Sequence, residues 1–496
     1  MRASAAVFFM AGSTYFAVVL GVIRGIVVMR YVGVMGRGLM QSVHVINRYT
    51  SNAHLGILHG LSKELPLKIG AGDDSEAEAI EASGMTWVVA LTALAALGMC
   101  IWGISEPTEE RPTALALVIG AGWLLASQTY NLYRCVLRSW GNFRLLSYLT
   151  AIDAAAAFGL TIYGAYRWGF LGAMLGMLAA WLLDLIILHL YSGVRIRPNW
   201  YSADAVRLFK TGLLILAITF TDTLLRTVDG AVIIRYYEAY RIGLYSVGMQ
   251  MAGYMFTLPE AAGFVIWPKI IEAWGASGDL RNMRRHVQLP TQVSAAVMPL
   301  LAGSAHILLP LLIVWIVPEF VNSTKAGQIL AWGGIFLALP LATNSVLIAT
   351  NRELAVIITR GLSGLALGAV SYWLVRQQAP IEHIAAAAAG AYAVASLLSL
   401  LLVLPKYFTG RQLAVELAGC YLPTLWAVVS LRLAGSLAAS FVMPHPADPL
   451  WASLYLFFFV CLYVPGVVYG KYHTGLWQEL RVLWQQRKAR KSGTNH

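Results

Sequence analysis

A polar stretch within residues 39–62 carries the side chains best suited to binding chemistry in this chain. Wound as a helix at 100° per residue, the segment gathers its polar groups within about 80° of His44. Most apolar side chains fall on the far side, and the polar arc holds Gln41, His44, Asn47, Arg48, Ser51, Asn52, His54, His59 and Ser62. Charges are costly in lipid, so this segregation predicts a continuous membrane helix that lines a hydrated cavity. The alternative is an amphipathic helix on the membrane surface.

Two arginines in these spans predict that the cavity binds an anionic ligand. Arg24 lies about eight residues from the outer end of the first apolar span, and Arg48 about nine from the outer end of the second. At ~1.5 Å per residue both are expected at a similar depth of roughly 12–14 Å. A guanidinium group donates two parallel hydrogen bonds to a phosphate, so the pair predicts a phosphate site. Snorkelling or pairing with an acid is the alternative for either arginine.

Further charges fall inside apolar spans. Asp222, Arg226 and Asp229 share one helical face, either as a cavity charge network or as a self-neutralised structural triad. Asp153 and Asp184 lie in adjacent spans at similar depth. Two neighbouring carboxylates share a proton or hold a cation, which makes this pair a candidate ion-coupling site for H⁺ or Na⁺. No cysteine or histidine spacing indicates a metal site, and no other cofactor is implied.

The composition places these residues in a membrane. Of the 496 residues, 58% are hydrophobic and only 12% are charged, and the mean hydropathy is +0.65. Apolar stretches of bilayer length recur along the chain and predict about fourteen transmembrane helices in an all-α polytopic fold. No predicted outer loop is long enough for an extramembrane catalytic domain, so an enzyme is not expected.

The formal net charge of +12 follows this topology. With the N-terminus inside, most of the 36 Lys and Arg residues fall on the cytosolic side, as the positive-inside rule requires. The basic charge therefore predicts orientation, with both termini cytosolic, and does not indicate a nucleic-acid partner.

Weak internal repeats indicate two related halves. RYVGVMGRGL at 30–39 aligns with RYYEAYRIGL at 235–244, although chance similarity between glycine-rich helix ends is the alternative. Duplicated halves around a central site are typical of alternating-access transporters. The predicted organisation is a six-helix lobe at 1–191, a cytosolic connector at 192–210, a pseudo-symmetric six-helix lobe at 211–404, two added helices at 405–470 and a basic cytosolic tail at 471–496.

Several motifs together resemble a known family. They are the Gly-x-Gly-Leu sequence from Gly36 to Leu39, LGILHGLSKELP and GAGD within 55–73, DAVRLFKTGLLI at 204–215 and GLYSVG at 243–248. This pattern is similar to the polysaccharide transporter family, the O-antigen-type flippases of the multidrug/oligosaccharidyl-lipid/polysaccharide (MOP) superfamily. The resemblance covers about residues 1–290, and beyond them it rests on helix count.

That resemblance implies two lobes around a cationic cavity and translocation of an undecaprenyl-diphosphate-linked oligosaccharide across the bacterial inner membrane. It implies a diphosphate bound by Arg24 and Arg48, with the sugars expected near Gln41, His44, Asn47, Ser51, Asn52 and His59. Membrane lipids, a polysaccharide polymerase and a chain-length regulator are the other expected partners. Several histidines in the second span depart from the family pattern and put its coupling ion in question. A peptidoglycan-precursor flippase, a cation-coupled multidrug antiporter and a membrane glycosyltransferase or polymerase are the alternatives.

Overall fold

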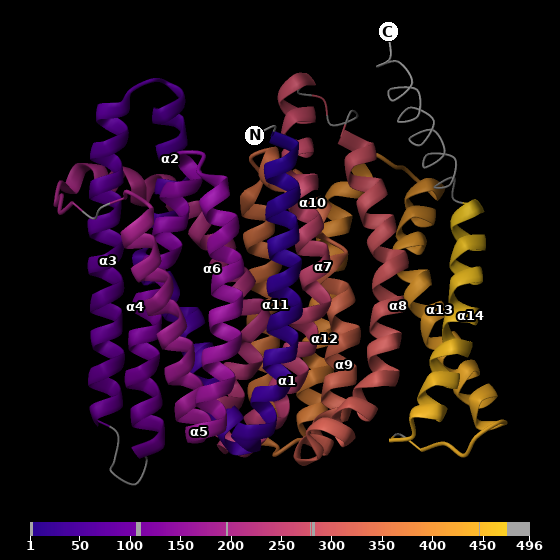
Figure 1. Ribbon diagram of the computed structural model, residues 1–496. Coiled ribbons are helices and arrows are strands. Elements are labelled where there is room, and N and C mark those ends of the chain that lie inside the picture. Colours follow the sequence, from indigo (N-terminus) through magenta and orange to yellow (C-terminus); the bar gives the residue numbers. More distant parts are fainter. Residues whose placement is uncertain are drawn as a thin grey trace. The chain divides into compact units, whose positions relative to one another are not determined.

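The computed structural model describes residues 3–105, 111–194, 197–277, 279, 283–445 and 447–473, which fold into helices without a described strand (Figure 1). Most of the predicted basic tail lies outside the described residues. The helices are α1 (Ala3–Thr50), α2 (Ile57–Gly70), α3 (Asp74–Ser105), α4 (Arg111–Ser139), α5 (Phe143–Tyr191), α6 (Ser202–Tyr236), α7 (Ala239–Ser277), α8 (Arg284–Ile316), α9 (Thr324–Ala338), α10 (Leu341–Ala349), α11 (Glu353–Arg376), α12 (Ile381–Val403), α13 (Arg411–Ala439) and α14 (Pro449–His473).

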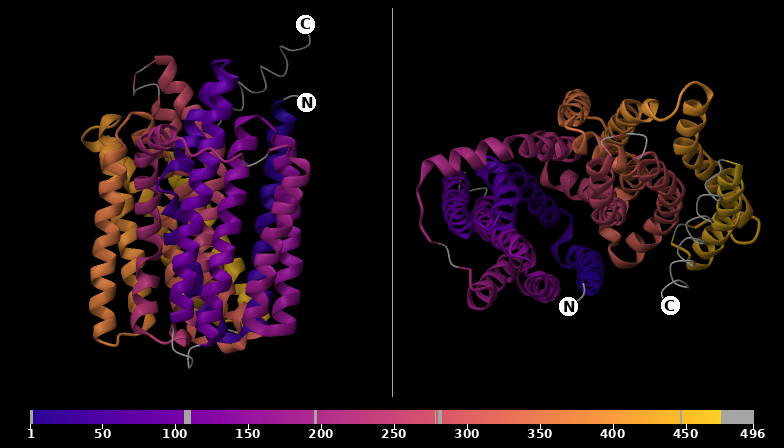
Figure 2. Two further views of the ribbon diagram at one scale, coloured as in Figure 1. Left: turned by 90° about the vertical axis from the view of Figure 1, so that its left-hand side faces the viewer. Right: turned by 90° about the horizontal axis from the view of Figure 1, so that it is seen from above.

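The chain forms two compact units. Unit 1 contains Met1–Ser246 and Arg360–Ile384, and unit 2 contains Val247–Thr359 and Ala385–His496. Within each unit the long helices run along a common direction, so that many of them appear nearly end-on in the view from above (Figure 2). Unit 1 thus combines α1–α6 with most of α11, which follows far later in the sequence. The division into two pseudo-symmetric six-helix lobes stays a prediction.

The protein is an all-helical, multi-pass membrane protein. In the described part, 11 helical segments are long and apolar enough to cross a membrane, whereas the sequence predicted about fourteen spans. Two of the 11, Phe16–His54 and Phe143–Tyr191, contain 39 and 49 residues. A bilayer core requires only ~20 helical residues, so each of these two segments has the length for two crossings.

The second of these long segments, in α5, is a tight helical hairpin. Trp168 and Gly169 leave the helical backbone conformation, with φ values of −135° and 62°. The halves then pack so closely that a Cβ on Gly164 would lie 2.0 Å from the Gly172 carbonyl oxygen, and one on Gly176 would lie 2.2 Å from that of Leu160. Contacts that pair residues ever further from the turn define antiparallel halves. The predicted boundary between two spans near residue 167 therefore corresponds to this turn.

A similar interruption divides α1. Gly33 has φ 69° and ψ 176°, which an L side chain rarely adopts, and it separates the first predicted span from the second. The second half begins directly after Gly33, about five residues earlier than the sequence predicted. This difference changes the depth of every residue that follows.

Unit 1 has an apolar core that holds α2, α3, α4, α5 and α6 together. Its fully buried members include Leu61, Ile80, Leu132, Leu188 and Leu208. In unit 2 a second core joins α8, α13 and α14 around Ile307, Leu431 and Phe459. Conversely, α3 exposes Leu94, Leu97, Ile101 and Ile104 on its surface. In water such a row would be an aggregation-prone patch, but it suits a lipid-facing helix.

Candidate functional site

The second half of α1 presents one polar face. Arg37, Gln41, His44 and Arg48 are spaced at i, i+4, i+7 and i+11, so they lie along one side of the helix. Arg37 and Gln41 are 7% and 9% exposed, and Nε of Arg37 donates to Oγ of Ser246 at 3.2 Å. The His44 ring contacts the edge of Trp123 of α4 at a centroid distance of 4.5 Å. The part of this face from Arg37 to His44 is therefore covered by protein, whereas Arg48 is exposed.

Positive charge is concentrated on that face. The guanidinium groups of Arg37, Arg48 and Arg24 all lie within electrostatic reach of the His44 imidazole. Arg24 precedes Gly33 by nine residues and Arg48 follows it by fifteen, so at ~1.5 Å per residue they differ in depth by roughly 9 Å. The expectation of equal depth was wrong, because the second half starts at Gly33 and not near Leu39. The arginines instead form a column along the helices.

The predicted continuous helix over 39–62 is also wrong. α1 ends at Thr50, a 3-10 turn η1 covers Ser51–His54, and α2 begins only at Ile57. Leu55 and Gly56 between them take φ values of 50° and 86°. Ser51 and Asn52 side chains donate to the Arg48 carbonyl oxygen at 2.8 and 3.1 Å, satisfying an acceptor that the helix end leaves open. Irregular backbone inside a span is tolerated only where protein or water satisfies it.

This break changes the surroundings of the predicted sugar ligands. Ser51 and Asn52 cap the end of α1. Asn47 donates from Nδ2 to the Gly120 carbonyl oxygen at 3.1 Å and so ties α1 to α4. His59 belongs to α2, beyond the break, where its Nε2 lies 3.5 Å from Oγ1 of Thr219. The helical-wheel angle therefore relates Gln41, His44 and Arg48 to one another, but it does not extend to His59.

A second charged group lies in α6 and α11. Asp222 forms ion pairs with Arg226, whose Nε lies 2.9 Å from its carboxylate, and with Arg360, whose Nη1 lies 3.2 Å away, and Arg48 also lies within its electrostatic reach. Two guanidinium groups thus pair with one carboxylate and a third acts on it electrostatically, which gives a local excess of positive charge. Asp229, the third member of the predicted network, is not part of it. It is 1% exposed and accepts a hydrogen bond from the Tyr245 hydroxyl instead.

The two candidate coupling carboxylates lie together in unit 1. Asp184 is fully buried, neither of its carboxylate oxygens has a hydrogen-bond partner among the described residues, and Asp153 lies within its electrostatic reach. Arg24 and Arg134 act on Asp153 electrostatically. Arg24 is therefore within electrostatic reach of both His44 on α1 and Asp153 of the acidic pair. Among the described residues, no group of three or more His, Cys, Asp or Glu side chains is placed to hold a metal ion.

Sequence reasoning missed two members of the site. Arg37 precedes residue 39, where the second predicted span begins, so that span does not include it. Extending the same helical wheel back by one turn would have placed Arg37 beside Gln41 and His44. Trp123 carried no signal, since one tryptophan in an apolar span is ordinary.

The sequence matches the family described as "Polysaccharide biosynthesis protein" over residues 70–323, a little more than half of the chain. The chain belongs to the polysaccharide biosynthesis protein family. No curated protein matches the sequence.

Solved structures show that this polysaccharide biosynthesis protein has the fold of the MOP superfamily. A lipid II flippase MurJ in an inward closed conformation is 14% identical, with a TM-score of 0.66 over 92% of this chain and 97% of that one. A MOP superfamily transporter from Pyrococcus furiosus is 12% identical, with a TM-score of 0.58 over 82% and 96%. The Vibrio cholerae MATE transporter VcmN in its bent form is 15% identical, with a TM-score of 0.56 over 84% and 98%.

Proposed function

We propose that this protein is a flippase that moves an undecaprenyl-diphosphate-linked oligosaccharide across the bacterial inner membrane for O-antigen, capsule or exopolysaccharide assembly. The observation that carries the proposal is the excess of guanidinium groups within the membrane spans of unit 1. Arg24, Arg37 and Arg48 lie around His44, while Arg226 and Arg360 share the single carboxylate of Asp222. So many cations within membrane spans are costly unless water or an anion accompanies them.

A diphosphate fits this arrangement chemically. It carries several acceptor oxygens, and planar guanidinium groups bind them in pairs. In the proposed site Arg24 and Arg48 hold the diphosphate, and Gln41 and His44 lie on the same face for the first sugars. The other predicted sugar contacts are Asn47, Ser51, Asn52 and His59. Their hydrogen bonds within the protein favour His44 over them, because its buried Nε2 has no hydrogen-bond partner among the described residues.

Transport requires two arrangements that bind the substrate differently. We propose alternating access with both termini cytosolic, and H⁺ or Na⁺ coupling at Asp153 and Asp184. Arg24 acts on both the acidic pair and the cationic face, so a change of charge at the pair alters the potential at the diphosphate site. A polysaccharide polymerase and a chain-length regulator are the proposed protein partners, because the exported unit must then be polymerised.

The family description supports a role in polysaccharide assembly. A transporter moves its substrate without changing it, so we propose no enzymatic activity. The named substrate of the MurJ structure, lipid II, favours the peptidoglycan-precursor flippase as the second candidate. That function also needs a diphosphate site, so the arginines do not separate the two. A multidrug antiporter of the same fold would need a cavity that attracts cations, which the guanidinium excess disfavours.

The test uses a strain that lacks the chromosomal gene and carries a plasmid copy. Arg24→Ala and Arg48→Ala are expected to abolish glycan display at the cell surface while the protein still inserts at wild-type abundance. Arg167→Ala, at an exposed residue beside the α5 turn, is the matched control and should leave display intact. Normal display by both site variants would refute the anion site, and loss of viability without the gene would favour the peptidoglycan precursor.

A further inference from the structure

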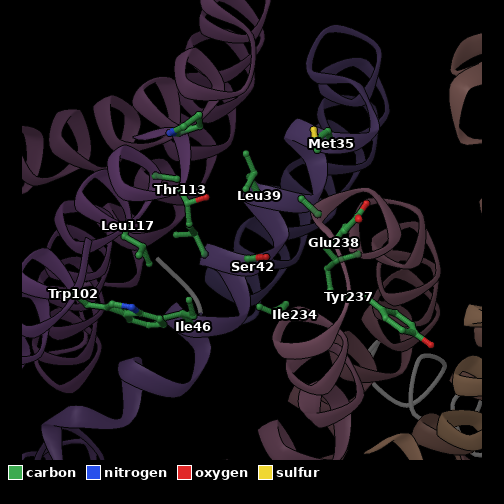
Figure 3. A pocket seen from close by; sticks show the side chains of 15 residues that line it. Met35, Leu39, Ser42, Ile46, Trp102, Thr113, Leu117, Ile234, Tyr237 and Glu238 are labelled. Atoms are coloured by element: carbon green, nitrogen blue, oxygen red, sulfur yellow. The ribbon is translucent and has the colours of Figure 1, made fainter. Parts of the chain in front are cut away.

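The face of α1 opposite the arginines lines a separate pocket. Leu39, Ser42, Val43 and Ile46 point into a cavity of about 550 Å³, between α4 and the junction of α6 with α7. In Figure 3, α1 residues lie between Thr113 and Leu117 on one side and Ile234 on the other. At 100° per residue, the pocket face is centred about 180° away from Gln41, His44 and Arg48. The pocket is therefore distinct from the proposed diphosphate site.

The lining suits a hydrocarbon chain. It is mostly aliphatic, and two of its polar side chains already have partners in the protein. Oγ of Ser42 donates to the Gly38 carbonyl oxygen at 3.1 Å, and the Tyr237 hydroxyl donates to that of Ala379 at 2.8 Å. An apolar cavity of about 150 Å³ accommodates one benzene molecule, so this pocket has room for roughly twenty carbon atoms. Water would find few partners there.

The rim of the pocket carries a negative charge. Met35, Trp102, Pro112 and Glu238 line the pocket and are exposed, so they mark its mouth. Glu238 is the one charged residue in the lining, and its carboxylate makes no salt bridge to any described residue. Close by, the guanidinium group of Arg241 lies 4.4 Å from the centre of the Tyr237 ring. A carboxylate with a neighbouring guanidinium complements a zwitterionic headgroup.

We infer that this pocket binds an acyl chain of phosphatidylethanolamine from the surrounding membrane, with the lipid ammonium group at Glu238 and its phosphate towards Arg241. Three observations favour this lipid over the tail of a diphosphate-linked substrate. The carboxylate at the mouth repels a diphosphate, the pocket lies on the opposite face of α1 from the arginines, and an ammonium group is the natural partner of Glu238. The inference is independent of the proposed function, since it requires no transported substrate.

The test is photo-crosslinking of the full-length protein in nanodiscs of phosphatidylethanolamine and phosphatidylglycerol. The probe is a phosphatidylethanolamine with a diazirine in its acyl chain, and labelled peptides are mapped by mass spectrometry. We expect labels on the segments that contain Ile46, Leu117 and Ile234. Leu39→Trp fills the pocket and should lower this labelling about tenfold, the effect of excluding roughly two methylene groups.

Leu115→Trp is the matched control, because Leu115 is exposed on α4 and does not line the pocket. Leu115→Trp should be labelled to the same extent as the wild type. Both tryptophan variants must show the size-exclusion profile and the melting temperature of folded protein. Glu238→Gln tests the headgroup: it should lower the preference for phosphatidylethanolamine over a phosphatidylglycerol probe by about two- to fivefold. Unchanged labelling in folded Leu39→Trp would overturn the site, and stronger labelling by an isoprenyl-phosphate probe would overturn the choice of lipid.

Discussion

Asp222 is the residue whose removal tests the charge arrangement most directly. Its carboxylate lies 2.9 Å from Nε of Arg226 and 3.2 Å from Nη1 of Arg360, and the three side chains are only 18–28% exposed. At an effective dielectric constant of ~20, each pair contributes about 5 kcal/mol of Coulomb energy before desolvation is subtracted. Removing one partner of a buried pair costs about 3–5 kcal/mol. Because these groups are partly exposed, we expect Asp222→Asn to lower the free energy of unfolding by about 3 kcal/mol.

The same substitution releases two guanidinium groups for an external anion. Purified Asp222→Asn protein should melt at a lower temperature than the wild type, and inorganic pyrophosphate should raise its melting temperature by more than it raises that of the wild type. The asparagine is isosteric, so packing is preserved. Asp204→Asn near the start of α6 is the control, with an expected loss below about 1 kcal/mol from the helix dipole alone.

The double variant Arg226→Gln with Arg360→Gln, in the Asp222→Asn background, should lose the added response to pyrophosphate. An Asp222→Asn protein that melts at the wild-type temperature would refute the ion-pair argument. An equal pyrophosphate response in Asp222→Asn and wild type would refute the release of an anion site.

Two further substitutions test packing in unit 1. Gly60→Ala should lower both the melting temperature and the surface display of glycan, because its Cβ would lie 2.0 Å from the Leu208 carbonyl oxygen and force α2 away from α6. The control is Gly70→Ala on the same helix, whose Cβ meets no atom within 4 Å and which should be neutral or slightly stabilising. Equal melting of the two variants would contradict close packing there. Tyr245→Phe should cost about 1–3 kcal/mol in thermal unfolding, because the buried Asp229 carboxylate loses its hydroxyl donor, whereas Tyr240→Phe at an exposed site should cost almost nothing. If Tyr245→Phe melts at the same temperature as Tyr240→Phe, this hydrogen bond does not contribute to the stability of the fold.

The sequence predicted well whatever depends on local pattern. Bilayer-length apolar runs gave the all-helical membrane class, and the motifs gave the family that residues 70–323 match. The polar face of Gln41, His44 and Arg48 also follows from helical spacing, because side chains three to four residues apart stay on one side of an unbroken helix. The helical wheel failed only where the helix itself ends, at Ser51–Gly56.

The break between α1 and α2 has a local signal in the sequence. Ser and Asn side chains compete with the helix for backbone carbonyl oxygens, and Gly56 permits a left-handed conformation. Its placement still depends on packing, because a Cβ on Gly56 would lie only 3.0 Å from the backbone of Gly212. A cluster of polar residues and a glycine allows a break, and the close approach of α6 selects where it occurs.

The sequence by itself determined that the protein lies in a membrane, that it is helical, and which kinds of charged group it carries. These properties follow from residue type and from spacing along one helix. Only the tertiary structure decided which charges meet. Arg360 joins Asp222 from α11, and Asp229 turns away to Tyr245, although Asp222, Arg226 and Asp229 share one face of α6. Residues on one face need not face one partner, because each turn of a long helix packs against a different neighbour. The pairing of charges is a property of that packing.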